Sequence, residues 1–133
     1  MTAITAPATV ATDGLLRFAM RLDAVLVGVT GVPFVAAAGW LSALTGIPVA
    51  VEYGLGVFFL AYGVVVYLLA GLARVRPGGI ATIAANALCT VGFTAAAFAG
   101  VWPLTGWGVA LLLGGAAYTA VIGAVQYVGL RRL

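Results

Sequence analysis

Four long stretches of the chain are almost entirely apolar, and short segments rich in glycine, proline and polar residues separate them. The stretches cover residues 24–44, 53–72, 80–101 and 108–130. Each is close to the roughly 20 apolar residues that an α-helix needs to cross a bilayer, whereas the strands of a membrane barrel are shorter and alternate polar with apolar residues. Short connections make neighbouring spans antiparallel. The pattern therefore predicts an all-α polytopic membrane protein, built as a four-transmembrane-helix antiparallel bundle.

The residues before the first stretch predict two further elements. Residues 1–14 are rich in threonine and alanine and are expected to form a disordered cytoplasmic tail, so that residues 15–133 form the four-helix membrane domain. Residues 15–22 place apolar side chains on one helical face, which is typical of a short interfacial helix. A signal peptide with an A-x-A cleavage site at residues 36–38 is the alternative, but the apolar run continues beyond these alanines.

The two halves of the chain resemble each other. An offset of 60 residues aligns Leu44-Thr45-Gly46 with Leu104-Thr105-Gly106, together with several further identical pairs. The similarity predicts a tandem repeat of two helical hairpins with the same topology, related by an axis along the membrane normal.

Composition supports a membrane protein and removes several chemistries. Of the 133 residues 65% are hydrophobic and 7% are charged, and the mean hydropathy is +1.24. Soluble domains carry about 25% charged residues. The absence of histidine excludes imidazole metal sites and triads, and a single cysteine, Cys89, excludes an internal disulfide or a thiolate cluster. We therefore expect no catalytic residues, no metal, no cofactor and no nucleic-acid partner.

Basic residues predict the orientation. All six fall on one side of the four-span arrangement, and the two opposite loops contain none. By the positive-inside rule both termini and the middle loop are expected to be cytoplasmic, in a multi-pass protein of the plasma (inner) membrane. These topology-setting residues are Arg17, Arg21, Arg74, Arg76, Arg131 and Arg132.

Polar residues at membrane depth are the candidates for function. Asp23, Asn86 and Gln126 are all expected near the inner side, where they would form a polar cluster. Such a cluster either supplies interhelical hydrogen bonds, with Asp23 paired to an arginine, or forms a vestibule that binds a proton or small cation. Glu52 is the candidate acid on the outer side, either stabilised at a helix N-terminus or used for proton coupling.

Backbone features predict where helices bend and pack. Pro33 lies within the first span and is expected to kink it, either as an inert bend or as a hinge. Small residues spaced by four predict close helix packing, within the chain or between two copies. They are Gly92, Ala96 and Gly100 on the third span and Gly115, Thr119 and Gly123 on the fourth.

Several short motifs resemble those of a known group of proteins. They are Arg21-Leu22-Asp23-Ala24, Gly28, Gly31, Gly46-x-Pro48, Gly56, Tyr62, Ala85-Asn86-Ala87, Gln126 and Gly129-Leu130-Arg131-Arg132. Together they resemble small four-span integral membrane proteins of high-GC Gram-positive (actinobacterial-type) bacteria, a resemblance that implies the fold and topology only. Length and span number also resemble the small multidrug resistance transporters, but the first span lacks their membrane-embedded glutamate.

Two functions are consistent with this sequence. The first is a non-enzymatic structural or accessory component of the membrane, acting as a homodimer or beside a larger membrane partner. The alternative is a small transporter or channel for protons, cations or lipophilic small molecules. It would depend on the polar residues at membrane depth.

Overall fold

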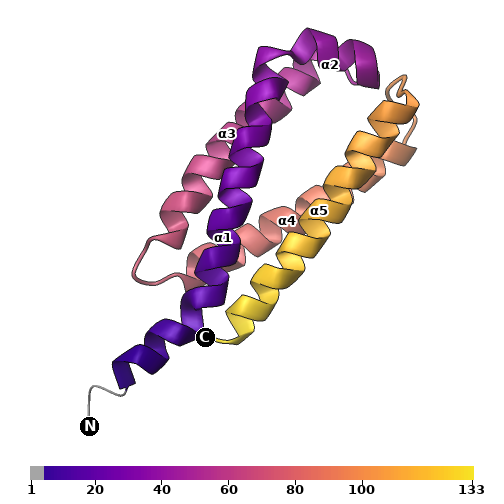
Figure 1. Ribbon diagram of the computed structural model, residues 1–133. Helices are drawn as coiled ribbons and strands as arrows, with labels where there is room; N and C mark the ends of the chain where they lie inside the picture. Colours follow the sequence, from indigo (N-terminus) through magenta and orange to yellow (C-terminus); the bar gives the residue numbers. More distant parts are fainter. Residues whose placement is uncertain (1–4) are drawn as a thin grey trace.

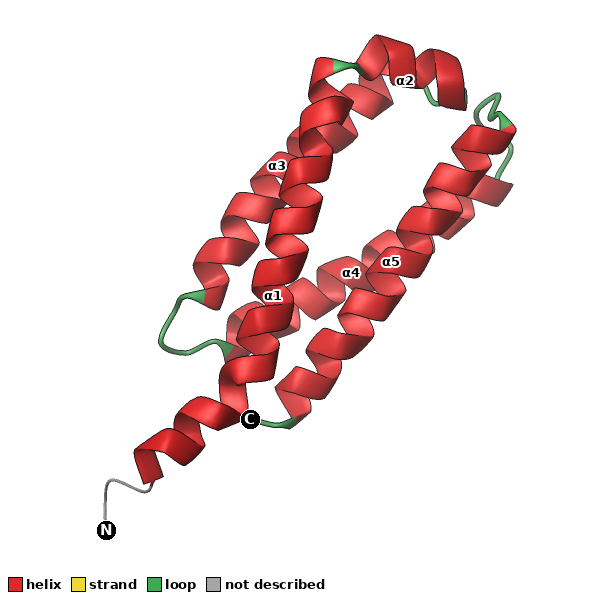
Figure 2. Cartoon of the chain, viewed as in Figure 1, coloured by secondary structure: helices red, strands yellow, loops and turns green. Residues whose placement is uncertain are grey.

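The computed structural model describes residues 5–133, with side chains from residue 12 onwards. Within this range the chain forms five helices and no strand: α1 (Thr5–Ala36), α2 (Ala38–Thr45), α3 (Val49–Ala70), α4 (Arg76–Phe98) and α5 (Gly106–Arg131). Four of them contain a segment long and apolar enough to cross a membrane, and loops occur only near the two ends of the bundle (Figure 2). The protein is therefore an all-α, multi-pass membrane bundle.

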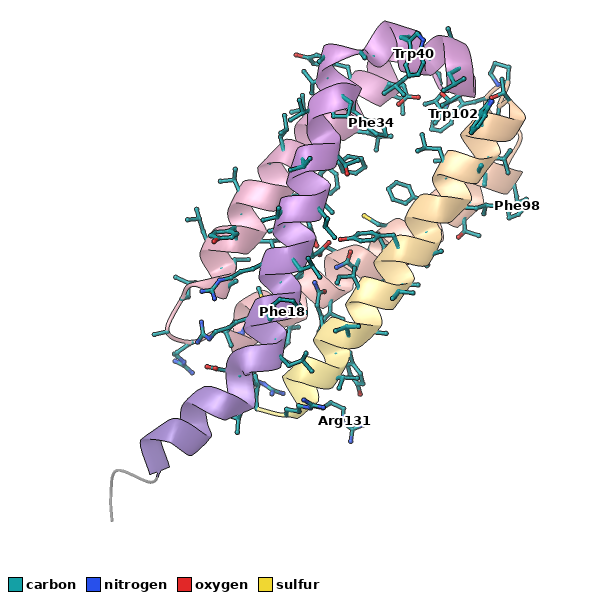
Figure 3. The ribbon with its side chains drawn as sticks, in the orientation of Figure 1. Phe18, Phe34, Trp40, Phe98, Trp102 and Arg131 are labelled. Atoms are coloured by element: carbon teal, nitrogen blue, oxygen red, sulfur yellow. The ribbon has the colours of Figure 1, made fainter. Side chains whose placement is uncertain are left out.

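The helices form two antiparallel pairs, α1 with α3 and α4 with α5, and α2 turns across one end (Figure 1). Trp40 and Trp102 lie at the end where α2 is found, which we call the tryptophan end, and Arg131 lies at the opposite, arginine end (Figure 3). The two pairs correspond to the two hairpins of the predicted repeat.

The first long helix begins and ends earlier than the predicted span over residues 24–44. The helix that qualifies as the first candidate span includes Thr12–Ala36 and ends before residues 37–44 of the predicted span. Leu16, Ala19 and Met20 are buried inside the bundle, so the predicted interfacial helix is the first part of this span. Helix α1 also includes residues 5–14 of the predicted tail, and residues 1–4 lie outside the described part. Asp23 lies inside α1, well before the end of the helix at Ala36.

The chain changes direction after Pro33. Pro33 lies inside α1, and the helix ends at Ala36, with Ala37 in a non-helical conformation (φ −127°, ψ 32°). The hydroxyl of Thr30 donates to the carbonyl of Leu26 at 2.7 Å, its own helical neighbour. The break creates α2, a short helix that the sequence pattern had merged with the first span.

Close backbone contact holds α1 against α3. A Cβ atom added at Gly63 would lie 2.7 Å from the carbonyl oxygen of Ala24 and 2.9 Å from the Cα of Gly28. Only glycine permits this approach, because no side chain separates the two backbones.

Both ends of the bundle are held by polar contacts. At the arginine end, the Arg17 guanidinium donates to the carbonyls of Ala70, Leu72 and Ala73, at or just after the C-terminus of α3. At the tryptophan end, the Thr105 amide donates to the Thr45 carbonyl at 3.0 Å. The Thr105 hydroxyl donates to the Leu44 carbonyl at 2.6 Å, so the two Leu-Thr-Gly copies are in contact.

Candidate functional site

The carboxylate of Asp23 lies at the centre of a buried polar cluster, and no part of its side chain is exposed. Its Oδ2 atom accepts hydrogen bonds from the Tyr62 hydroxyl at 2.6 Å, the Asn86 amide at 3.0 Å and the Gln126 amide at 3.1 Å. Its Oδ1 atom accepts from the Tyr118 hydroxyl at 2.7 Å. The structure thus brings together Asp23, Asn86 and Gln126, the three residues of the candidate inner cluster, and adds two tyrosines.

All four spans contribute to this Asp23 cluster. Asp23 comes from α1, Tyr62 from α3, Asn86 from α4, and Gln126 and Tyr118 from α5. Helical rise places Asp23 about 9 Å further along α1 than Arg17, and Asn86 about 15 Å from the start of α4. The cluster therefore lies within the bundle and not at its arginine end.

The four hydrogen-bond partners of Asp23 are all neutral side chains, two tyrosine hydroxyls and two amides. In the described part of the chain, the one ion pair is between Arg17 and Asp13, at 3.0 Å. Hydrogen bonds from neutral groups, and no basic side chain, therefore replace the water that Asp23 loses on burial.

A cavity of about 360 Å³ adjoins the Asp23 cluster. Tyr62, Asn86, Tyr118 and Thr119 line it near the cluster. The remaining walls are mainly apolar and aromatic, and include Phe34, Phe58, Phe59 and Phe93. A mostly apolar cavity of this size with a few convergent polar groups is typical of a small-molecule site.

A shallower hollow between α3 and α4 adjoins the cavity. This hollow shares Leu55, Phe58 and Phe93 with the cavity, and Leu88 and Gly92 also line it. Leu88 is 74% exposed, and Gly92 is exposed too. In a membrane, this hollow would face lipid and not water.

Cys89 lines both hollows and has no disulfide partner. As the one cysteine of the chain, it is a natural position for chemical labelling of the cavity.

Glu52 is separate from the Asp23 cluster. It lies in the first turn of α3, near the tryptophan end, and its side chain is fully buried. Its Oε1 atom is 2.6 Å from the Thr45 hydroxyl, while Oε2 has no hydrogen-bond partner among the described residues. Glu52 is not one of the residues that line the cavity, so the structure does not bring the two buried acids together.

The small residues predicted to pack helices have different surroundings. On α5, an added Cβ at Gly115 would touch the Phe93 ring, one at Gly123 would touch the Asn86 side chain, and the Thr119 hydroxyl bonds Thr90 at 2.7 Å. This face packs on α4. On α4, Gly92 faces open space, Ala96 is half-buried, and Gly100 lies beyond the helix at φ +70°.

Sequence reasoning missed the two tyrosines. Tyr62 and Tyr118 each interrupt an apolar span far from its ends, which is the same signal that singled out Asn86 and Gln126. The ring of a tyrosine is apolar and fits a membrane helix, so its hydroxyl is a weaker sequence signal than an amide or a carboxylate.

Comparison with protein-family models, curated proteins and solved structures found no match to this chain. The described residues contain no group of three or more histidine, cysteine, aspartate or glutamate side chains placed to hold a metal ion.

Proposed function

We propose that this protein is a small non-enzymatic carrier that binds a lipophilic molecule in the cavity between its helices. The observation that carries the proposal is the buried Asp23 carboxylate beside an apolar cavity. An ionisable group at membrane depth is costly and usually functional. A purely structural cluster would also have no need of the adjoining cavity.

The hollow that adjoins the cavity supports a lipophilic ligand. A molecule dissolved in the bilayer reaches this hollow between α3 and α4 without crossing water. At the tryptophan end the Thr105 hydroxyl joins the two helix pairs by its hydrogen bond to the Leu44 carbonyl. At the arginine end Gly129 of α5 lies against the backbone of Leu16 of α1, and the cavity lies between the pairs, away from these two contacts. Such a bundle can admit a ligand from the side without coming apart.

Protection of Cys89 tests the proposal. The purified protein in proteoliposomes is treated with lipid-soluble N-phenylmaleimide in the presence of 4-phenylbutylamine, 4-phenylbutanol or 4-phenylbutanoate. These probes share one apolar body and differ in the charge of the polar end. We expect at least one of them to slow alkylation, because a bound probe covers the thiol.

Two glycine variants control for indirect effects. Gly114 lines the cavity and has open space around it, so Gly114→Phe is expected to fill the cavity and remove probe protection. Gly54 also has open space but does not line the cavity, so Gly54→Phe is expected to keep protection. If no probe slows alkylation of the wild-type protein, the carrier proposal is wrong.

We further propose that the protein forms homodimers through α4, the structural role expected first. The support is that α4 is the least buried of the four spans and that Val91, exposed on its surface, lines neither hollow. Cross-linking in native membranes is expected to yield a dimer that Val91→Trp weakens and that Val64→Trp, at a similarly exposed position on α3, does not. A wild-type protein that remains monomeric, with no cross-linked partner, would contradict this role.

For localisation we propose the bacterial plasma membrane, with the arginine end in the cytoplasm. The support is that Arg17 reaches the end of α3, Arg74 and Arg76 lie at the start of α4, and Arg131 ends α5. Arg21 lies one helical turn from Arg17. Green fluorescent protein fused after Leu133 is expected to fluoresce, and alkaline phosphatase at the same position to be inactive. The reverse result would invert the orientation.

A further inference from the structure

Among the polar groups that line the cavity, only the Cys89 thiol, a weak donor, has a proton that no described residue accepts. The hydroxyls of Tyr62 and Tyr118 both donate to Asp23, and the Asn86 amide donates to Asp23, Tyr62 and Gln126. The Thr30 hydroxyl donates to the Leu26 carbonyl.

The hydroxyl proton of Thr119 is also donated within the protein. Its hydroxyl is within hydrogen-bond distance of the Ala116 carbonyl and of Thr90, and Thr90 is in turn within reach of the Asn86 carbonyl. If Thr90 donates to Thr119, Thr119 donates to the Ala116 carbonyl; if Thr119 donates to Thr90, Thr90 donates to the Asn86 carbonyl. Both hydroxyl protons are therefore bonded within the protein.

Acceptors, in contrast, remain available. No described residue donates to the Tyr118 oxygen, although this oxygen has lone pairs in addition to the proton it gives Asp23. The Asn86 Oδ1 atom likewise receives no hydrogen bond from a described residue. It is not among the fully buried atoms that lack a partner, so it is accessible to a ligand. The polar end of the cavity is therefore complementary to a hydrogen-bond donor and not to an acceptor.

Charge favours the same kind of ligand. Asp23 lies directly behind Tyr62, Asn86 and Tyr118, and no described basic side chain pairs with it. In a site away from water, a negative charge acts over several ångströms because screening is weak. An anionic head group at this position would be repelled, and a cationic one attracted.

Aromatic rings form much of the cavity wall. The rings of Phe34 and Phe59 lie 5.3 Å apart, those of Phe59 and Phe93 6.5 Å, and those of Phe58 and Tyr62 6.0 Å. Such rings bury the apolar body of a ligand and also attract cations over their faces.

Building on the proposed function, we infer that the ligand class is a lipophilic amine. Its ammonium group is held by the Tyr118 oxygen and Asn86 Oδ1 beside Asp23, and its apolar body lies among the phenylalanines. A cavity of about 360 Å³ limits it to a small molecule.

The three phenylbutyl probes test the inference, measured at neutral pH as the concentration that half-protects Cys89. We expect 4-phenylbutylamine to protect at the lowest concentration, the alcohol at a higher one and the carboxylate least. Asp23→Asn is expected to raise the half-protecting concentration of the amine by about tenfold or more, since it removes the charge. It should leave that of the alcohol nearly unchanged.

Matched variants separate the site from general effects. Asp13→Asn makes the same substitution at the carboxylate paired with Arg17, outside the cavity, and is expected to leave all three concentrations unchanged. Tyr118→Phe removes an acceptor oxygen and is expected to weaken the amine, whereas Tyr127→Phe, at a half-exposed position, should not. If Asp23→Asn does not fold, the Tyr118 pair decides.

The outcomes distinguish this inference from the proposed function. Protection by the alcohol or the carboxylate equal to that by the amine overturns the cationic ligand class but leaves the carrier in place. If the amine protects Cys89 equally well in the folded variants Asp23→Asn and Tyr118→Phe, the cationic ligand class is likewise overturned and the carrier proposal stands. A lack of protection by every probe removes the carrier and, with it, the inference.

Discussion

The carboxylate of Asp23 has exchanged water for four hydrogen bonds from neutral side chains. Hydrogen bonds to a charged group contribute about 1.5–3 kcal/mol each, more than those between neutral groups. Each donor thus offsets part of the cost of burying the charge. Of the four donors, Gln126 alone does not line the cavity.

Replacing Gln126 by leucine tests this stabilisation apart from ligand binding. The change removes one donor to Asp23 and the acceptor of the Asn86 amide while keeping a similar volume. We expect Gln126→Leu to lower the free energy of unfolding by about 1–3 kcal/mol, measured by denaturation in detergent. Tyr127→Phe on the same helix is the control, and an equal loss in both variants would contradict the prediction.

Thr45 supplies the one hydrogen bond of the Glu52 side chain among the described residues. We expect Thr45→Val to destabilise the protein by about 1–3 kcal/mol, because it leaves a buried carboxyl group without a partner. In a Glu52→Leu background the same substitution should cost clearly less.

Thr94→Val provides the comparison for Thr45→Val. The Thr94 hydroxyl only donates to the Thr90 carbonyl of its own helix and is exposed. We expect a small effect there. A cost at Thr45 that is unchanged when Glu52 is replaced would show that the pair is not responsible.

At the scale of the helices, three of the four predicted spans lie close to observed helices. The predicted spans 53–72, 80–101 and 108–130 differ from α3, α4 and α5 by a few residues at each end, since loops with glycine and proline bound them. Only α1 differs substantially. Its early residues carry two arginines that moved the predicted start inward, although the helix buries the apolar face beside them.

Gly63→Ala is expected to push α1 and α3 apart. The added methyl group would meet the backbone of Ala24 and Gly28, which cannot move aside as a side chain does. We expect a loss of about 1–3 kcal/mol in the free energy of unfolding, typical of overpacking. Gly54→Ala, in open space on the same helix, should be neutral or slightly stabilising. Equal stability of the two variants would contradict this packing.

In the whole molecule, the two helix pairs are in contact at both ends of the bundle and enclose a cavity between these contacts. The arginine end contains the hydrophobic cluster of Leu16, Met20, Ala24, Val66, Ala70 and Val75. Towards the tryptophan end the helix pairs enclose the cavity, with α2 across the top (Figure 1). This shape suits a binding site that is entered from the membrane.

A carrier of this shape should speed the movement of its ligand across a bilayer. We expect proteoliposomes containing the wild-type protein to take up 4-phenylbutylamine faster than protein-free liposomes, with Gly114→Phe reducing the difference and Gly54→Phe keeping it. Uptake is followed with radiolabelled amine. Equal rates with and without protein would limit the function to binding.

By itself, the sequence determined the fold class, the number of spans and the charge asymmetry, because these depend on local runs of apolar residues and on where arginines fall along the chain. It also singled out Asp23, Asn86 and Gln126 as polar residues in an apolar background. Tertiary structure alone decided that these residues meet, that Tyr62 and Tyr118 join them, and that a cavity lies beside them. Hydrogen bonds between residues up to 103 positions apart depend on how helices are rotated and how closely they approach. A pattern along one helix does not contain that information.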